Sequence, residues 1–162
     1  MNVVASGSVV LPGLSQNADP ANPGPIDTWQ YAQTQRLEVL QLLTDLVPRR
    51  FLLLSGDYHV SAAVEIHGNG GILGAAIVAP PIYAPLPYAN ASPGAIDIAE
   101  TVTLASDRLR LVVPKDGEQR RGSGFGCIGV RERDGGYEIT YERDLWVWES
   151  GTPSTPRAVI TL

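Results

Sequence analysis

The chain has 162 residues, enough for one domain with a substantial apolar core. Its 12 lysine and arginine residues against 17 aspartate and glutamate residues give a net charge of −5, without the basic footprint that nonspecific nucleic-acid binding requires. The single cysteine, Cys127, excludes an intrachain disulfide and a cysteine-rich zinc site. No uncharged apolar run reaches the length of a membrane helix. We therefore expect a folded domain without a nucleic-acid or membrane partner, whose localisation the sequence leaves unknown.

The amino-terminal part of the sequence has the pattern of a strand–helix–strand unit. Residues 1–11 carry the paired valines of a strand. Asp27 followed by Gln30 matches a capping box, which predicts a helix that begins at Asp27 and ends before Pro48. The apolar run at 51–54 is typical of a strand covered on both faces, and it is predicted to lie parallel to the first strand. The apolar stripe of the predicted helix consists of Trp29, Ala32, Leu37, Leu40, Leu43 and Val47.

The rest of the chain has the pattern of an antiparallel β-meander. Strands are predicted at 60–66 and 72–79, on either side of a glycine-rich turn that contains His67, and a proline-rich loop follows at 80–93. Partial alternation predicts a further strand at 101–113. Asp134-Gly135-Gly136 is the pattern of a hairpin turn, which predicts strands at 125–133 and 137–148. An edge strand is expected at 158–162, and we divide the chain into residues 1–95 and a β-rich extension, 96–162, packed on the same domain.

Three further features of the second half are interpreted as structural. Residues 124–129 match G-x-G-x-x-G but precede a hairpin, so we interpret them as a glycine-rich strand and not as a dinucleotide loop. Cys127 within that strand is expected to be a buried, unreactive thiol. Arg120 and Arg121 are expected to form a solvated basic turn.

Two polar residues that could bind a metal follow the apolar run at 51–54. Asp57 and His59 come after Ser55 and Gly56, and their spacing of two places both side chains on one side of an extended chain. Sites in α/β sheets form beyond the carboxyl ends of strands, and Gly56 would let the backbone turn sharply there. Carboxylate and imidazole are both metal ligands. The alternative interpretation is a hydrogen-bonded polar turn beside a core strand.

The segment Phe51-Leu-Leu-Leu-Ser-Gly-Asp-Tyr-His59 resembles the signature of PhoD-like alkaline phosphatases, a branch of the calcineurin-like metallophosphatase superfamily. The stretch at 27–31, the leucine-rich helix after it and the proline-rich segment at 79–85 resemble the same family in order and spacing. The resemblance implies a four-layer αββα metal-dependent phosphoesterase in which two metal ions polarise the phosphoryl group and supply a hydroxide. It implies His59 and Asp57 as metal ligands, divalent or trivalent metal ions as cofactors and a phosphate ester as substrate.

The family's remaining metal ligands precede this signature and have no counterpart in this sequence, which contains two histidines. The resemblance is therefore to the carboxyl-terminal half of the family's α/β sandwich, a βαβ start followed by an antiparallel meander, and no catalytic residue is assigned. The first hypothesis is a fragment or shortened relative of a phosphoesterase. The alternative is a catalytically silent binding or self-association module that retains the half-fold. Either predicts apolar strand faces and unpaired edges around residues 51–54 and 72–78, hence self-association.

Overall fold

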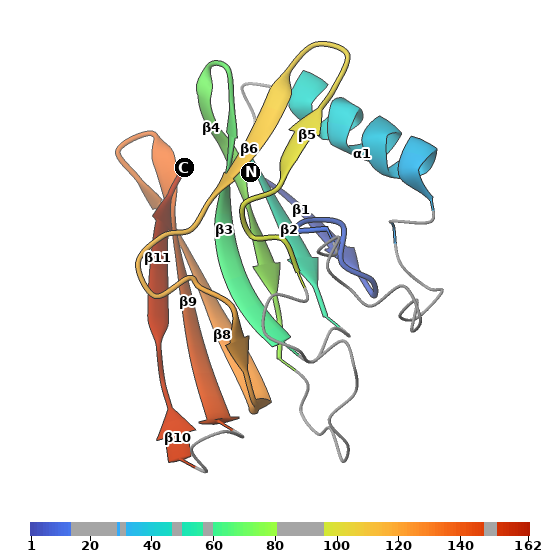
Figure 1. Ribbon diagram of the computed structural model, residues 1–162. Helices are drawn as coiled ribbons and strands as arrows, with labels where there is room; N and C mark the ends of the chain where they lie inside the picture. Colours follow the sequence, from blue (N-terminus) through green and yellow to red (C-terminus); the bar gives the residue numbers. More distant parts are fainter. Residues whose placement is uncertain (14–28, 30–31, 47–49, 57–59, 81–95, 148–151) are drawn as a thin grey trace, which may run out of the picture.

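A computed structural model describes residues 1–13, 29, 32–46, 50–56, 60–80, 96–147 and 152–162 (Figure 1). These residues form an α/β fold with one helix, α1 (Gln33–Asp45), and two sheets. The first is a seven-stranded mixed sheet of order β1-β2-β4-β3-β6-β5, with β7 paired to β3; the second is a four-stranded antiparallel sheet. The mixed sheet contains β1 (Asn2–Ser6), β2 (Phe51–Ser55), β3 (Val60–Gly68), β4 (Gly71–Val78), β5 (Thr101–Thr103), β6 (Arg108–Val112) and β7 (Arg120–Arg121). The antiparallel sheet contains β8 (Ser123–Arg133), β9 (Gly136–Val147), β10 (Thr152–Ser154) and β11 (Arg157–Thr161).

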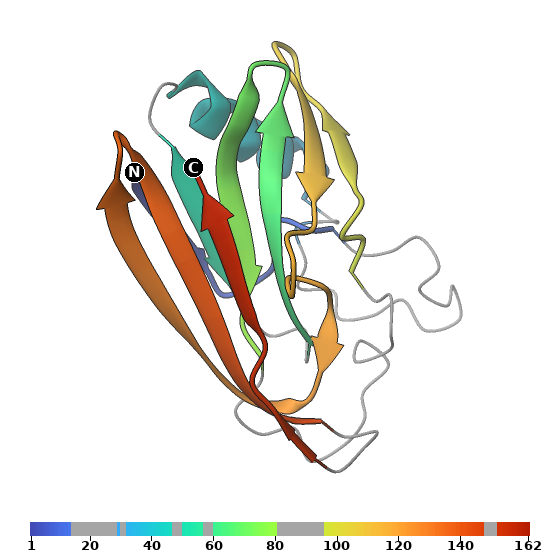
Figure 2. The same cartoon turned by 90° about the vertical axis from the view of Figure 1, so that its left-hand side faces the viewer.

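The described residues form three layers, in which the mixed sheet lies between α1 and the antiparallel sheet (Figures 1 and 2). The alternation of side chains along β2 explains how one strand serves both interfaces. Phe51 and Leu53 belong to the core under α1, whereas Leu52 belongs to the core between the two sheets. All three are 1% exposed, so the prediction of a strand covered on both faces is confirmed.

The predicted strand–helix–strand unit is confirmed, and β4 extends it. β1 pairs with β2 in parallel, from Asn2 opposite Phe51 to Ser6 opposite Ser55. β4 also runs parallel to β2 but antiparallel to β3, because the β3–β4 hairpin returns the chain between β2 and β3. β5 and β6 complete the same sheet, so residues on both sides of position 95 share it.

The helix differs from its prediction in both its start and its buried face. It begins at Gln33 with Ala32 as an N-cap that makes no side-chain hydrogen bond; Asp27 and Pro48 lie outside the described residues. Its buried residues include Arg36 and Leu40, whereas Leu37, predicted to be buried, is 36% exposed. Arg36 can be buried because its guanidinium has hydrogen-bond acceptors inside the protein: it donates to the carbonyl of Val10 and to the carboxylate of Glu100. Hydrophobic periodicity cannot detect a buried arginine of this kind.

The second half of the chain is largely as predicted. The hairpin of β8 and β9 is confirmed, and its turn has positive φ at Asp134 (50°) and Gly135 (81°), as a primed two-residue turn requires. β11 is confirmed as a strand that pairs with β9. The predicted strand at 101–113 is instead a hairpin of two short strands, β5 and β6.

The prediction that 51–54 and 72–78 carry unpaired edges is wrong, because the parallel β2 and β4 each have a neighbour on both sides. Among the described edge strands, which also include β5 and β11, β1 and β8 pair with a single strand each. These two edge strands carry exposed apolar side chains: Val3 is 56% exposed, Ile128 37% and Val130 48%.

Candidate functional site

The carboxyl ends of the three parallel strands meet at one edge of the mixed sheet. Ser6 of β1 lies opposite Ser55 of β2, and Ser55 lies opposite Val78 of β4. β3 begins at this same edge because it is antiparallel to β4, with Ala62 opposite Val78. We call this edge, defined by Ser6, Ser55, Val78 and Val60, the carboxyl edge. It is the edge at which α/β sheets form ligand sites.

Asp57 and His59, the predicted metal ligands, belong to the segment that joins Gly56 to Val60 in sequence, and both lie outside the described residues. The residues that flank this segment, Gly56 and Val60, are described, and both lie at the carboxyl edge. That the two side chains project to one side of the strand end stays a prediction. Gly56 itself is not required by backbone geometry: it is not among the glycines with positive φ, and a Cβ at this position would meet open space. The expectation that it permits a sharp turn is therefore not supported.

The serines at the carboxyl edge have different hydrogen-bonding states. Ser6 Oγ accepts a hydrogen bond from Trp29 Nε1 at 3.2 Å. Ser55 is 7% exposed, and its Oγ has no hydrogen-bond partner among the residues that the structure describes. A buried hydroxyl without a hydrogen-bond partner destabilises the folded state by about 1–3 kcal/mol. A further polar group at this edge that bonded to Ser55 Oγ would remove that cost.

An arginine pair also reaches the carboxyl edge. Arg120 and Arg121 form β7, which pairs with the first two residues of β3, Val60 and Ser61. They are half-buried in a strand, so the expectation of a solvated turn is wrong. Arg120 forms an ion pair with Glu118. Burial raises the pKa of Glu118, but the hydrogen bond with its own backbone and the guanidinium charges of Arg120 and Arg143 outweigh this and leave it below its ordinary value.

A buried arginine joins the antiparallel sheet to this edge. Arg143 of β9 is 0% exposed, and its guanidinium donates to Ser61 Oγ at 3.3 Å, to the Glu118 carbonyl at 2.9 Å and to the Asp116 carbonyl. It lies 5.6 Å from the centroid of the Tyr141 ring, whose hydroxyl donates to the Val78 carbonyl at 3.1 Å. Burial lowers the pKa of Arg143 and raises that of Tyr141. The sequence showed nothing of this role, because Arg143 occupies a position that alternation assigns to an apolar side chain.

The described residues do not by themselves fit a metal centre. No group of three or more histidine, cysteine, aspartate or glutamate side chains comes together within that part of the chain. Asp57 and His59 therefore remain the candidate ligands, and they provide two donors. Among the described helices, none is long and apolar enough to cross a membrane.

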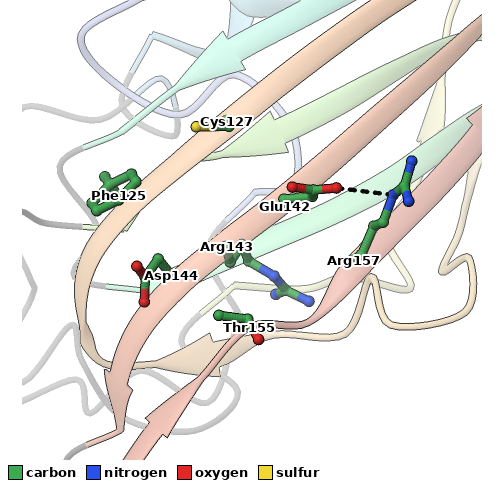
Figure 3. A pocket seen from close by; sticks show the side chains of 7 residues that line it. All are labelled: Phe125, Cys127, Glu142, Arg143, Asp144, Thr155 and Arg157. Carbon is green, nitrogen blue, oxygen red and sulfur yellow. Dashed lines mark ion pairs between the residues drawn. The ribbon is translucent and has the colours of Figure 1, made fainter.

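Away from the carboxyl edge, a hollow lies on the outer face of the antiparallel sheet, where β8, β9 and β11 form its surface (Figure 3). It has a volume of about 420 Å³, and its lining includes Phe125, Cys127, Glu142 and Arg157. Cys127 is exposed, so the expectation of a buried thiol is wrong, because β8 is an edge strand whose outer face meets solvent. Glu142, which lies opposite Cys127, is paired with Arg157 at 3.1 Å (Figure 3). This pairing compensates the charge of Glu142, and Asp144 is the other carboxylate in the lining.

Comparisons of the chain with protein-family models, with curated proteins and with solved structures find no match.

Proposed function

We propose that the chain contributes one side of the metal centre of a PhoD-like phosphoesterase, with Asp57 and His59 as two of the metal ligands. One observation carries the proposal: the signature segment follows β2, a strand buried on both faces, at the edge where three parallel strands end. That edge is where α/β sheets place ligands. The substrates would be phosphate monoesters or diesters, and the cofactors divalent or trivalent metal ions.

The four-layer αββα architecture belongs to the same proposal. In this proposal α1, the mixed sheet and the antiparallel sheet would correspond to three of its layers, and the fourth would be a helical layer on the outer face of the antiparallel sheet. That face carries exposed apolar side chains: Phe125 and Trp146 are each 56% exposed, and Val159 is 45% exposed. Side chains of this kind on one sheet face mark a surface that another element or partner covers.

The proposal includes weak metal binding by the isolated chain and no catalysis. Catalytic zinc sites have three protein ligands and structural sites four, so two donors leave most coordination positions to water. A two-metal phosphoesterase also needs both ions to clamp the phosphoryl group and to activate water. We therefore derive no catalytic step for this chain alone.

The two histidines of the sequence provide an internal control for metal binding. Addition of Mn²⁺ should broaden the imidazole NMR signals of His59 at millimolar concentration, and should leave those of His67 sharp. His59→Ala should abolish the binding, whereas His67→Ala should preserve it. Equal broadening of both rings, or tight binding that survives His59→Ala, would contradict the assignment.

Hydrolysis assays test the same site independently. The chain alone should not cleave p-nitrophenyl phosphate or its bis-ester with Ca²⁺, Mn²⁺, Zn²⁺ or iron added. Activity should emerge only when a matching amino-terminal half of the family's fold is supplied. Turnover by the chain alone that His59→Ala removes would contradict the incomplete site and would indicate a minimal phosphatase.

Self-association is a second candidate function, which the edge strands favour. β8 pairs with β9 residue by residue from Ser123 to Arg133, and no strand of the described residues pairs with its other side. Val130 on this edge is 48% exposed. Sedimentation velocity should show dimers that Val130→Lys dissociates, while Val159→Lys on the outer sheet face does not. A monomer at all concentrations would contradict this function.

A further inference from the structure

A polar pocket lies at the end of the mixed sheet opposite the carboxyl edge. β3 begins at the carboxyl edge with Val60 and ends at Gly68, so its nine residues separate the two ends by about 25 Å. The pocket has a volume of about 320 Å³, near the lower end of the range for small-molecule sites. It is lined by His67, Gly68, Asn69, Thr101, Arg108 and Arg110.

Strand pairing brings the polar side chains of this pocket together. Arg110 of β6 lies directly opposite His67 of β3 on one side and opposite Thr101 of β5 on the other. Residues directly opposite one another point to the same face of a sheet, so all three side chains share one face. Arg108 lies two residues before Arg110 and therefore points to this face as well. The intervening Leu109 is buried under α1.

The lining of the pocket contains two arginines and no acidic side chain. Neither Arg108 nor Arg110 forms an ion pair with a carboxylate in the described part of the chain. Two carboxylates adjoin the pocket and bond to its lining residues: Glu65 Oε2 lies 2.7 Å from His67 Nε2, and Asp107 Oδ1 accepts from the backbone N–H groups of Asn69 (2.9 Å) and Arg108 (2.7 Å). The lining thus presents two guanidinium groups that pair with no carboxylate of the described residues, in a chain whose net charge is −5.

We propose that this pocket binds a phosphate group. Two guanidinium groups offer planar, paired donors that match the oxygens of phosphate, and the Thr101 hydroxyl adds a neutral donor. Two positive charges also match a dianion better than a carboxylate, which would leave one arginine uncompensated. The site is separate from the proposed metal centre, because none of its residues belongs to the carboxyl edge.

The test is a titration of the full chain with inorganic phosphate in the presence of EDTA. Binding is monitored by the NMR signals of His67 and of the guanidinium groups. Sulfate serves as a second dianion, acetate as a monoanion and chloride as the control for ionic strength. Phosphate and sulfate should shift these signals at concentrations at which acetate and chloride do not. Arg110→Ala should weaken phosphate binding by roughly tenfold or more, the size expected for a charged hydrogen bond.

Two control variants distinguish phosphate binding at this pocket from nonspecific attraction to surface arginines and from binding at the proposed metal centre. Arg131→Ala removes an exposed arginine of β8, which belongs to the antiparallel sheet and not to the mixed sheet that forms the pocket, and should leave phosphate binding unchanged. His59→Ala should also leave it unchanged, so this site and the metal centre can fail independently. Equal responses to acetate and phosphate, or equal losses in Arg110→Ala and Arg131→Ala, would overturn the proposal. Both arginines are exposed on the surface, so a normal thermal melt is expected for each variant.

Discussion

Arg36→Met should strongly destabilise the protein, because it breaks a buried ion pair that joins three segments. Arg36 Nη2 lies 2.8 Å from Glu100 Oε1 and 2.7 Å from Glu100 Oε2, and Nε donates to the Val10 carbonyl at 2.8 Å. The two side chains are 6% and 16% exposed, and Glu100 also accepts from the backbone N–H of Gly13 at 2.6 Å. Methionine keeps the aliphatic packing of the arginine stem but removes the charge, so Glu100 is left buried without its cation.

The removal of one partner from a buried pair costs about 3–5 kcal/mol. For a chain of this size a loss of 1 kcal/mol lowers Tm by about 2–4 °C, so we expect a decrease of roughly 6–20 °C. Urea denaturation and thermal melts followed by circular dichroism measure both quantities. Arg157→Ala is the matched control, because its pair with Glu142 is exposed (58% for each side chain) and is expected to contribute at most about 1 kcal/mol. A loss in Arg36→Met no larger than that of the control would refute the reasoning.

Two further predictions concern titration and reactivity. The pKa of Glu118 is lower in the folded chain than its ordinary value of 4.5, so its ionised form contributes stability that is present above that value and is lost as the pH falls through the folded-state pKa. Glu118→Gln should therefore lose less stability than the wild type between pH 5 and pH 3 in acid titrations of the melting temperature, and parallel curves would contradict the role of this carboxylate. Cys127 is exposed, so one thiol per native chain should react with Ellman's reagent without denaturant; reaction only in urea would show that it is covered.

The sequence by itself determined the local elements. The apolar run at 51–54 identified a strand buried on both faces, because a short apolar run between polar flanks is typical of such a strand and is too short for a buried helix. Asp134-Gly135 identified the β8–β9 turn, because few residue pairs adopt positive φ at both positions. The parallel pairing of β1 with β2 followed from the helix between them. At the candidate site, the sequence located Asp57 and His59 after a core strand, and the structure placed that strand end where parallel strands converge.

The tertiary structure decided which polar side chains are inside and which strands lie at the edges. Arg36 and Arg143 are buried because carbonyl and carboxylate partners from distant segments, at Val10, Glu100 and Asp116, come together only in the folded chain. The same applies to the phosphate pocket, in which His67 meets Arg110 through pairing between strands 43 residues apart in sequence number (110 − 67). Hydrophobic periodicity is a property of one segment of the chain, whereas the burial of a charged side chain depends on hydrogen-bond and ion-pair partners from other segments. For that reason, local patterns identified the strands, and only the assembled sheets decided their edges, their charged core and their pockets.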